Sequence, residues 1–219
     1  MTKRGLLIVI DGIDGSGKAT QAKKLRDRIS AEGYDVETID FPQYTNNFFG
    51  GLVRQYLDGR FGVATDVNPY LASVLYAADR WESSHKIWAW LDQGKIVILD
   101  RYMTSNIIHQ GTKLKSDELQ QYIQWLSTME FDVFKIPKPD KVLFLHVTAE
   151  VSYDLIGKRG QGFDGHNTMQ HLQAAERQAL DICNTLGWHT IECCSPHGIL
   201  PIDTIHEAIF ASVKPMLHN

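Results

Sequence analysis

The sequence has little cysteine and no long hydrophobic run, and both shortages narrow the class of protein. Its three cysteines are Cys183, Cys193 and Cys194. They include no Cys-x-x-Cys pair, so we expect structural thiols in a reducing cytoplasm rather than a disulfide framework or a zinc site. No segment approaches the roughly 20 apolar residues of a membrane span, so no membrane partner is expected. The first apolar run stops at Asp11, which favours a strand over a signal peptide.

An excess of positive charge is also missing. The 219 residues include 26 acidic and 22 basic side chains, a net charge of −4. Proteins that coat nucleic acid need an excess of Lys and Arg, so nucleic acid is not an expected partner and the basic residues should act locally, in a pocket. The chain shows no internal repeat, low-complexity tract or long linker, and we predict a single domain over residues 1–219.

Short apolar runs alternate with helical patterns along the chain, which predicts βαβ units and a parallel sheet. The predicted strands are Leu6–Ile10, Val36–Asp40, Ile96–Asp100, Val142–Val147 and His189–Glu192. The predicted helices are Lys18–Glu32, Pro69–Gln93, Thr168–Leu186 and Ile202–Met216. Fully apolar strands are typical of sheets covered on both faces. The pattern therefore predicts a three-layer α/β/α sandwich around a five-stranded parallel sheet.

The strongest motif is a glycine-rich loop between the first predicted strand and the first predicted helix. It consists of Gly12, Ile13, Asp14, Gly15, Ser16, Gly17, Lys18, Ala19 and Thr20. Glycines let backbone N–H groups converge on phosphate oxygens, and the helix N-terminus adds partial positive charge. Lys18 is placed to reach the β- and γ-phosphates of ATP. We assign all nine residues to ATP binding in a P-loop.

Ala19 departs from the P-loop pattern, which has Ser or Thr after the lysine to ligate Mg²⁺. Mg²⁺ keeps several waters and needs few protein ligands. We expect it to be held by substrate phosphates, water and a carboxylate, with Asp100 as the best candidate. The alternative for Asp100 is a cap on the helix that follows. The same departure is the main argument for a rival function, a nucleotide-binding protein without catalysis.

Four further segments narrow the identity of the acceptor. They are Phe41-Pro42-Gln43-Tyr44, the helical Tyr76-Ala77-Ala78-Asp79-Arg80-Trp81, Asp100-Arg101-Tyr102 with Ser105-Asn106, and Pro137-Lys138-Pro139-Asp140. With the P-loop, these segments make the chain resemble the thymidylate kinase family from Leu6 to about Asp164. The resemblance implies a P-loop NTPase fold, Mg²⁺-dependent transfer of the γ-phosphoryl group of ATP to dTMP, and a homodimer.

The resemblance also implies an acceptor site. The residues assigned to dTMP are Asp14, Phe41, Pro42, Tyr44, Tyr76, Arg80, Arg101, Ser105, Asn106 and His109. Tyr76 can stack on a thymine ring, Arg80 on the same helical face can donate to a carbonyl, and Asn106 can pair with the N3 edge. Ordinary helix core is the alternative for Tyr76. A surface ion pair with Asp79 or Glu82 is the alternative for Arg80.

Catalysis is assigned to Lys18, Arg101, Asp14 and Arg159. By resemblance, Arg101 clamps the donor and acceptor phosphates together, and Asp14 is the loop carboxylate that recognises the deoxyribose 3′-hydroxyl. Phosphoryl transfer depends mainly on positioning and charge neutralisation, so no strong base is required.

A glycine-rich segment is predicted to act as a short lid over about residues 158–167. Some members of the family carry an arginine inside the P-loop, where this chain has Gly15. The missing positive charge is then expected from Lys158 and Arg159, the only basic residues of the lid, and both are assigned to ATP.

His109 stands where the family usually has Tyr or Phe, a ring that crowds the sugar 2′ position. The strength of selection for deoxyribose therefore stays open. So does a related kinase activity on dUMP, a deoxynucleoside or another monophosphate.

Overall fold

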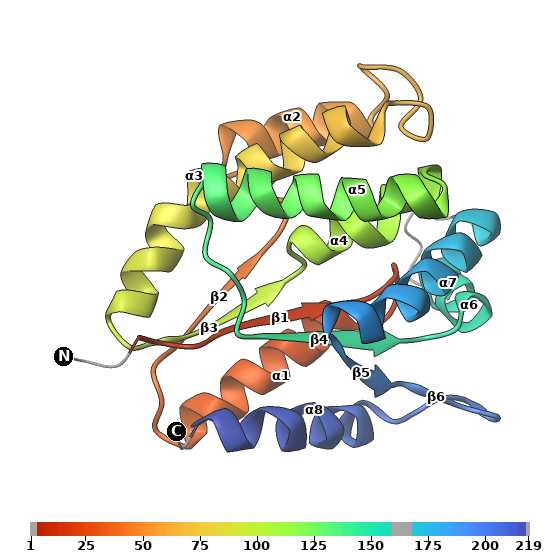
Figure 1. Ribbon diagram of the computed structural model, residues 1–219. Coiled ribbons are helices and arrows are strands. Elements are labelled where there is room, and N and C mark those ends of the chain that lie inside the picture. Colours follow the sequence, from red (N-terminus) through yellow and green to blue (C-terminus); the bar gives the residue numbers. More distant parts are fainter. Residues whose placement is uncertain (1–3, 159–167, 218–219) are drawn as a thin grey trace.

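The computed structural model describes residues 4–158 and 168–217, and a five-stranded parallel sheet runs through its centre (Figure 1). The strands are β1 (Leu7–Asp11), β2 (Val36–Asp40), β3 (Ile96–Asp100), β4 (Lys141–His146) and β5 (His189–Glu192). Their order in the sheet is β2-β3-β1-β4-β5. The predicted parallel sheet is confirmed, with the first and fourth strands shifted by one residue along the chain.

Four of the helices follow the sequence prediction to within one residue at each end. They are α1 (Lys18–Ala31), α3 (Pro69–Asp92), α7 (Met169–Leu186) and α8 (Ile202–Leu217). The start of α3 shows why the local signal was clear. The Asn68 side chain accepts hydrogen bonds from the backbone N–H groups of Tyr70 and Leu71, and Pro69 occupies the first helical position, where its missing N–H costs nothing.

Other elements carry weaker local signals and were not predicted. They are α2 (Phe48–Leu57), α4 (Met103–His109), η1 (Gly111–Lys113), α5 (Ser116–Ser127), η2 (Thr128–Val133), α6 (Ala149–Lys158) and the β6–β7 hairpin (Cys194–Ser195 and Gly198–Ile199). Among the residues described, no helix combines the length and apolar character needed to cross a membrane.

The sheet is buried on both faces, as its apolar strands predicted. In β1, Leu7 and Val9 belong to a hydrophobic cluster that includes residues of α3, α4, α5 and α7. Ile8 and Ile10 point to the opposite face and pack with residues of α1 and α8. Figure 1 shows these two sets of helices on opposite sides of the sheet. The three-layer α/β/α sandwich is confirmed.

The strand register brings the predicted motifs together at one edge of the sheet. Ile10 of β1 is the register partner of Asp100 at the end of β3. Asp40 at the end of β2 is also a partner of Asp100. The loops that follow these three strands therefore emerge side by side, the position at which α/β sheets bind ligands.

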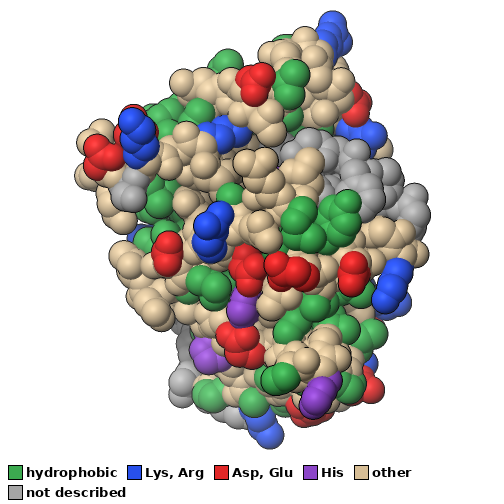
Figure 2. Space-filling view, turned by 90° about the vertical axis from the view of Figure 1, so that its right-hand side faces the viewer, with side chains coloured by type: hydrophobic (Ala, Val, Ile, Leu, Met, Phe, Trp, Pro, Cys, Tyr) green, Lys and Arg blue, Asp and Glu red, His purple; other side chains and the backbone are tan. Residues whose placement is uncertain are grey.

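His146, at the end of β4, joins two strands to two helices. Its Nδ1 lies 2.6 Å from Oε2 of Glu192 on β5, and its Nε2 lies 3.0 Å from Oε1 of Glu176 on α7. Glu176 also accepts the backbone N–H of Ala149, the first residue of α6, at 2.8 Å. Figure 2, which views the side where the strands end, shows histidine and acidic side chains next to one another. Burial alone would lower the pKa of His146, but hydrogen bonds to Glu176 and Glu192 raise it.

We expect the His146→Gln variant to lose stability mainly at acidic pH, by roughly 1.5–3 kcal/mol. A histidine whose pKa is raised by folding stabilises the protein fully below its unfolded pKa of about 6.5. That contribution disappears as the pH rises through the folded value. Urea unfolding of both proteins over a series of pH values should give a difference that shrinks above about pH 7.

The exposed His197→Gln variant is the matched control, and it should change the unfolding free energy by less than about 0.5 kcal/mol throughout. If the loss of unfolding free energy in His146→Gln stayed constant or grew with pH, His146 would not be a charged imidazolium that is hydrogen-bonded to Glu176 and Glu192.

Candidate functional site

A cavity of about 510 Å³ opens where β1, β2 and β3 end. Its volume lies within the range of small-molecule sites. It is lined by Asp14, Gly15, Gly17, Lys18, Ala19, Thr20, Phe41, Pro42, Tyr44, Leu57, Tyr76, Arg80, Asp100, Arg101, Tyr102, Ser105, Asn106, His109, Gln110 and Ile156.

The glycine-rich loop forms one end of this cavity, and α6 presses against it. Gly15 has a φ of +81°, and a Cβ added there would lie 2.9 Å from the carbonyl oxygen of Ser152 in α6. The Ser152 hydroxyl donates a hydrogen bond to the carbonyl of Asp14. A side chain at position 15 would therefore be strained and would collide with α6. This close packing leaves no room for an arginine side chain at position 15.

Lys18 is held over the loop by the loop's own carbonyls. Its Nζ donates to the carbonyl oxygens of Gly12 at 3.0 Å and Ile13 at 2.8 Å. Burial and the nearby Arg101 lower the pKa of Lys18 to about 8, although Asp14 opposes them. The site thus disfavours this positive charge until a negative group arrives. A phosphate would supply that group.

Asp14 and Arg101 form an ion pair across the floor of the cavity. The Arg101 backbone has a φ of +68°, a left-handed conformation that is uncommon for arginine and typical of functional sites. Its Nη2 donates to Oδ1 of Asp14. Burial alone would raise the pKa of Asp14, but Arg101, His109 and Lys18 hold it well below its usual range. Asp14 is therefore an anion and an acceptor at physiological pH.

Asp100 supplies a second carboxylate beside Lys18. Its Oδ1 is buried and has no hydrogen-bond partner in the part of the chain that the structure describes. Burial raises the pKa of Asp100, and Lys18 and Arg101 only partly offset this. The helix that follows is preceded by Tyr102, without a side-chain cap. The alternative of a helix cap at Asp100 is therefore wrong, and the carboxylate stays available to a ligand.

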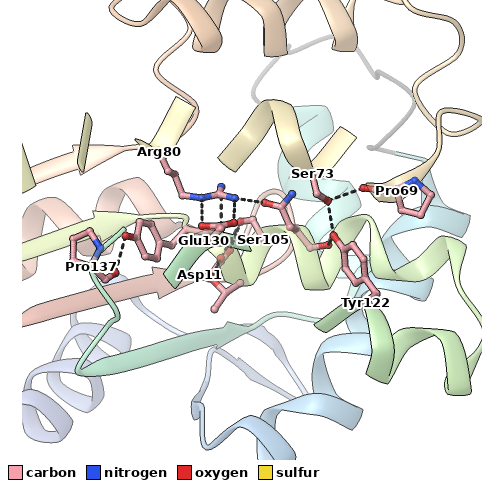
Figure 3. Close-up of polar contacts among 11 residues, drawn as sticks. Asp11, Pro69, Ser73, Arg80, Ser105, Tyr122, Glu130 and Pro137 are labelled. Carbon is pink, nitrogen blue, oxygen red and sulfur yellow. Dashed lines mark hydrogen bonds and ion pairs between the residues drawn. The ribbon is translucent and has the colours of Figure 1, made fainter. Parts of the chain in front are cut away.

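A buried ion pair closes the opposite end of the cavity (Figure 3). Arg80 donates from Nε and Nη2 to the two carboxylate oxygens of Glu130, at 2.9 and 2.5 Å. The side chains are only 2% and 0% exposed. Burial alone would lower the pKa of Arg80, but Glu130 raises it. The predicted alternative of a surface pair with Asp79 or Glu82 is wrong.

Asn106 of α4 and Gln110, the residue directly after this helix, complete this end. Arg80 Nη2 donates to Oδ1 of Asn106 at 2.9 Å. Since arginine only donates, this bond orients the amide and leaves Nδ2 directed elsewhere. Nδ2 of Asn106 and Oε1 of Gln110 are buried without a partner among the described residues, and both side chains line the cavity. One donor and one acceptor therefore await a ligand here.

Comparison with known proteins agrees with this geometry. Residues 10–200 match the sequence profile described as thymidylate kinase. The chain belongs to the thymidylate kinase family. Thymidylate kinase of Mycobacterium tuberculosis (strain H37Rv) is 34% identical over 174 residues, 79% of this chain and 80% of the relative. Human thymidylate kinase is 29% identical over 212 residues, 94% and 89% of the two chains.

A solved structure of thymidylate kinase from Candida albicans has the same fold. It superposes with a TM-score of 0.74 at 27% identity and covers 97% of this chain and 92% of the other. The chain of 219 residues is therefore a kinase with a P-loop NTPase fold.

Most of the residues assigned to ATP and dTMP line this same cavity of the kinase. Three loop residues do not. Gly12, Ile13 and Ser16 are buried within the loop, where the carbonyls of Gly12 and Ile13 accept hydrogen bonds from Lys18. Lys158 is exposed and is the last residue of α6. Arg159 and the rest of the predicted lid lie outside the described residues.

Two functional positions in the kinase were not predicted. Asp11 is fully buried, and its carboxylate accepts from the backbone of Gly12 at 2.8 Å and from the hydroxyl of Ser105 at 2.8 Å. It ties the P-loop to α4. Gln110 was missed as well, although it directly follows the assigned His109. Its only local signal is a polar side chain four residues after Asn106, at the residue that ends α4.

Proposed function

We propose that the chain transfers the γ-phosphoryl group of ATP to dTMP, giving ADP and dTDP. The observation that carries the proposal is the pair of unpartnered polar atoms, Nδ2 of Asn106 and Oε1 of Gln110, in one cavity with the P-loop. Buried polar groups are almost always hydrogen-bonded in a working structure. A ligand that satisfies both and reaches the P-loop with a phosphate is a nucleoside monophosphate.

The two atoms match the edge of a thymine ring. That edge presents a carbonyl, the N3–H donor and a second carbonyl. Nδ2 of Asn106 can donate to a carbonyl, and Oε1 of Gln110 can accept from N3–H. The Gln110 amide is oriented by Tyr56, whose hydroxyl donates to Ala64 at 2.8 Å and lies 3.5 Å from Gln110 Nε2. Cytosine has an acceptor at N3, so Oε1 of Gln110 could accept only from the exocyclic amino group at C4.

The remaining cavity residues support the base and the acceptor phosphate. Tyr76 lines the cavity and makes an edge-to-face contact with Tyr56, so its ring can stack on the base. Arg101 gives Nη2 to Asp14, and a guanidinium has five N–H donors. The same arginine can therefore contact phosphate oxygens of donor and acceptor.

Catalysis then depends on charge neutralisation. Negative charge spreads over the transferring oxygens in the transition state, and Lys18 and Arg101 lie at the end of the cavity where it develops. The attacking phosphate oxygen is already anionic, so no general base is needed. Arg159 of the predicted lid is proposed to add a further positive charge, and Lys158 to contact ATP.

The donor set suits Mg²⁺. Mg²⁺ binds oxygen ligands and keeps several waters. Asp100 offers a buried carboxylate oxygen without a hydrogen-bond partner among the described residues. The Ala19 side chain has no oxygen to offer. We infer that Asp100 holds the ion or its waters, while substrate phosphates supply the other ligands. When bound, the ion supplies charge neutralisation at the phosphate oxygens.

We also propose a homodimer of single-domain chains in the cytoplasm. Leu71, Val74 and Trp81 are exposed on one face of α3, next to the exposed Phe48 of α2. Contiguous apolar surface of this kind is typical of protein interfaces, and a second copy of the chain is the proposed partner. The three cysteines are free thiols, which suits a reducing compartment.

A coupled assay of ADP release tests the function directly. The purified chain is given ATP and Mg²⁺ with dTMP, dUMP, dCMP, AMP or thymidine in turn. We expect release to be fastest with dTMP. A preference for dUMP or thymidine would select the related kinase activity. Release with none of them would select a nucleotide-binding protein without catalysis.

Gln110→Met should raise the KM for dTMP about tenfold or more, because the variant keeps the volume but loses the acceptor for N3–H. The KM for ATP should stay within about twofold. The matched control is Gln173→Met, an exposed glutamine outside the cavity, which should leave both KM values unchanged. Equal weakening of dTMP and ATP would show that Gln110 only supports the core.

A further inference from the structure

His109 contacts a second histidine, His171, which was not among the predicted site residues. His109 of α4 lines the cavity. Its Nδ1 lies 3.2 Å from Nε2 of His171 on α7. The two ring planes are 12° apart and their centroids are 5.5 Å apart, so the rings lie nearly coplanar and edge to edge along this contact. None of the α7 residues that the structure describes lines the cavity, so the printed contact by which His171 can affect a ligand is the one to His109.

The position of His109 gives this contact its significance. His109 lies one turn after Asn106 and directly before Gln110, which form the base end of the cavity. Its charge also helps to lower the pKa of Asp14, so its ring lies close to the end that receives phosphate. A nucleotide that spans these two ends has its sugar between them. The His109 ring therefore faces the middle of the acceptor.

Helix α7, which carries His171, is fixed by contacts at its start and further along its length. The Thr168 hydroxyl accepts the backbone N–H of His171 at 3.2 Å and caps α7. Further along α7, Nε2 of Gln178 donates to the carbonyl of Ile107 in α4 at 3.2 Å. A Cβ added at Gly111 would lie only 2.1 Å from that nitrogen. Helix α7 is thus in close contact with α4 and with the η1 turn that follows it, and His171 is a fixed partner.

We propose that His171 is a positioning residue for acceptor recognition, which holds the imidazole ring of His109 against the sugar of the acceptor. The inference rests on the proposed function. The hydrogen bond fixes the rotation of the His109 ring, and the edge of the His171 ring behind it fixes its depth in the cavity wall. A ring restrained before binding loses less conformational freedom when the acceptor arrives. His171 therefore affects the KM of the acceptor more than any other kinetic constant.

Two substitutions separate the hydrogen bond from the bulk of the His171 ring. His171→Phe keeps the ring and removes its nitrogens, and it should raise the KM for dTMP about tenfold. His171→Gln removes the ring but places an amide near the position of Nε2, and it should recover the dTMP KM to within about threefold. In both variants kcat and the KM for ATP should stay within about twofold. The exposed His197→Phe variant is the matched control.

A double-mutant cycle with His109→Phe tests whether His171 acts through His109. A phenylalanine at position 109 has no nitrogen to hold, so adding His171→Phe should change the dTMP KM by less than about twofold. The full tenfold effect in that background would overturn the proposal. So would a His171→Phe variant with an unchanged dTMP KM, or one with equal losses for dTMP and ATP.

The imidazole nitrogen resonances of His109 give a readout that does not depend on turnover. His171→Phe should shift the Nδ1 signal, and His171→Gln should leave it closer to that of the unmutated protein. Absence of any shift would overturn the hydrogen bond. If the unmutated chain transfers nothing to dTMP, the proposed function fails and this inference fails with it. If the unmutated chain is active but His171→Phe changes neither the dTMP KM nor the Nδ1 signal, only this inference is overturned.

Discussion

We expect the Lys18→Ala variant to lose at least about 10³-fold in kcat and to remain folded. The ammonium group of Lys18 donates hydrogen bonds to the carbonyls of Gly12 and Ile13 in the loop, beside the Asp14–Arg101 pair. Removing it leaves the charge that develops on the transferring phosphoryl group without its nearest compensation. An interaction made mainly in the transition state lowers kcat and kcat/KM together.

The fold should survive because the folded environment disfavours this charge. Folding lowers the pKa of Lys18 to about 8, mainly by burial, so the charged form contributes no net stability. The assay is coupled ADP release, with thermal unfolding measured on the same samples. Lys23→Ala, an exposed lysine one turn later on α1, is the matched control for both. Unmutated turnover in Lys18→Ala would end the kinase interpretation.

Glu130→Ala should have the largest effect on stability, about 3–5 kcal/mol. Glu130 is fully buried and accepts two hydrogen bonds from Arg80, so its loss leaves an uncompensated guanidinium in the interior. For a chain of this size, each kcal/mol shifts Tm by roughly 2–4 °C. Thermal unfolding should therefore begin about 6–20 °C lower. Asp27→Ala, which breaks an exposed pair with Arg26, should cost no more than about 1 kcal/mol.

The double variant Arg80→Met with Glu130→Leu separates stability from substrate binding. Replacing a buried ion pair by apolar side chains of similar size is often neutral or stabilising, so the double variant should regain most of the lost Tm. Asn106 would still lack the partner that orients its amide. The KM for dTMP should therefore stay at least about tenfold raised. Full recovery of both properties would show that the pair serves stability alone.

Elements with strong local signals could be predicted from the sequence. The central strands β1, β3 and β4 are short, mainly apolar runs, and α3 begins at a proline after a capping asparagine. The P-loop is a contiguous motif, so its residues could be named without a structure. In each case the information lies within a few residues along the chain, where hydrophobic period, caps and turns act.

The helix α2 shows why other elements were missed. Its sequence contains Gly50 and Gly51, which weaken a helix. Its first N–H groups, those of Phe48 and Phe49, are capped by the carboxylate of Glu82 in α3, at 2.9 and 3.1 Å. A cap supplied from 34 residues away cannot be seen in a local pattern. Packing against α3 stabilises this helix more than its own propensity does.

The sequence by itself determined the chemistry of this protein: a phosphate loop, the order of its strands and helices, and side chains suited to a nucleotide. The tertiary structure decided which partner each side chain has. Glu130 lies 50 residues from Arg80 in the chain, and His171 lies 62 residues from His109. Such pairs form only where helices cross. The crossing depends on how whole faces pack, and no local pattern encodes it.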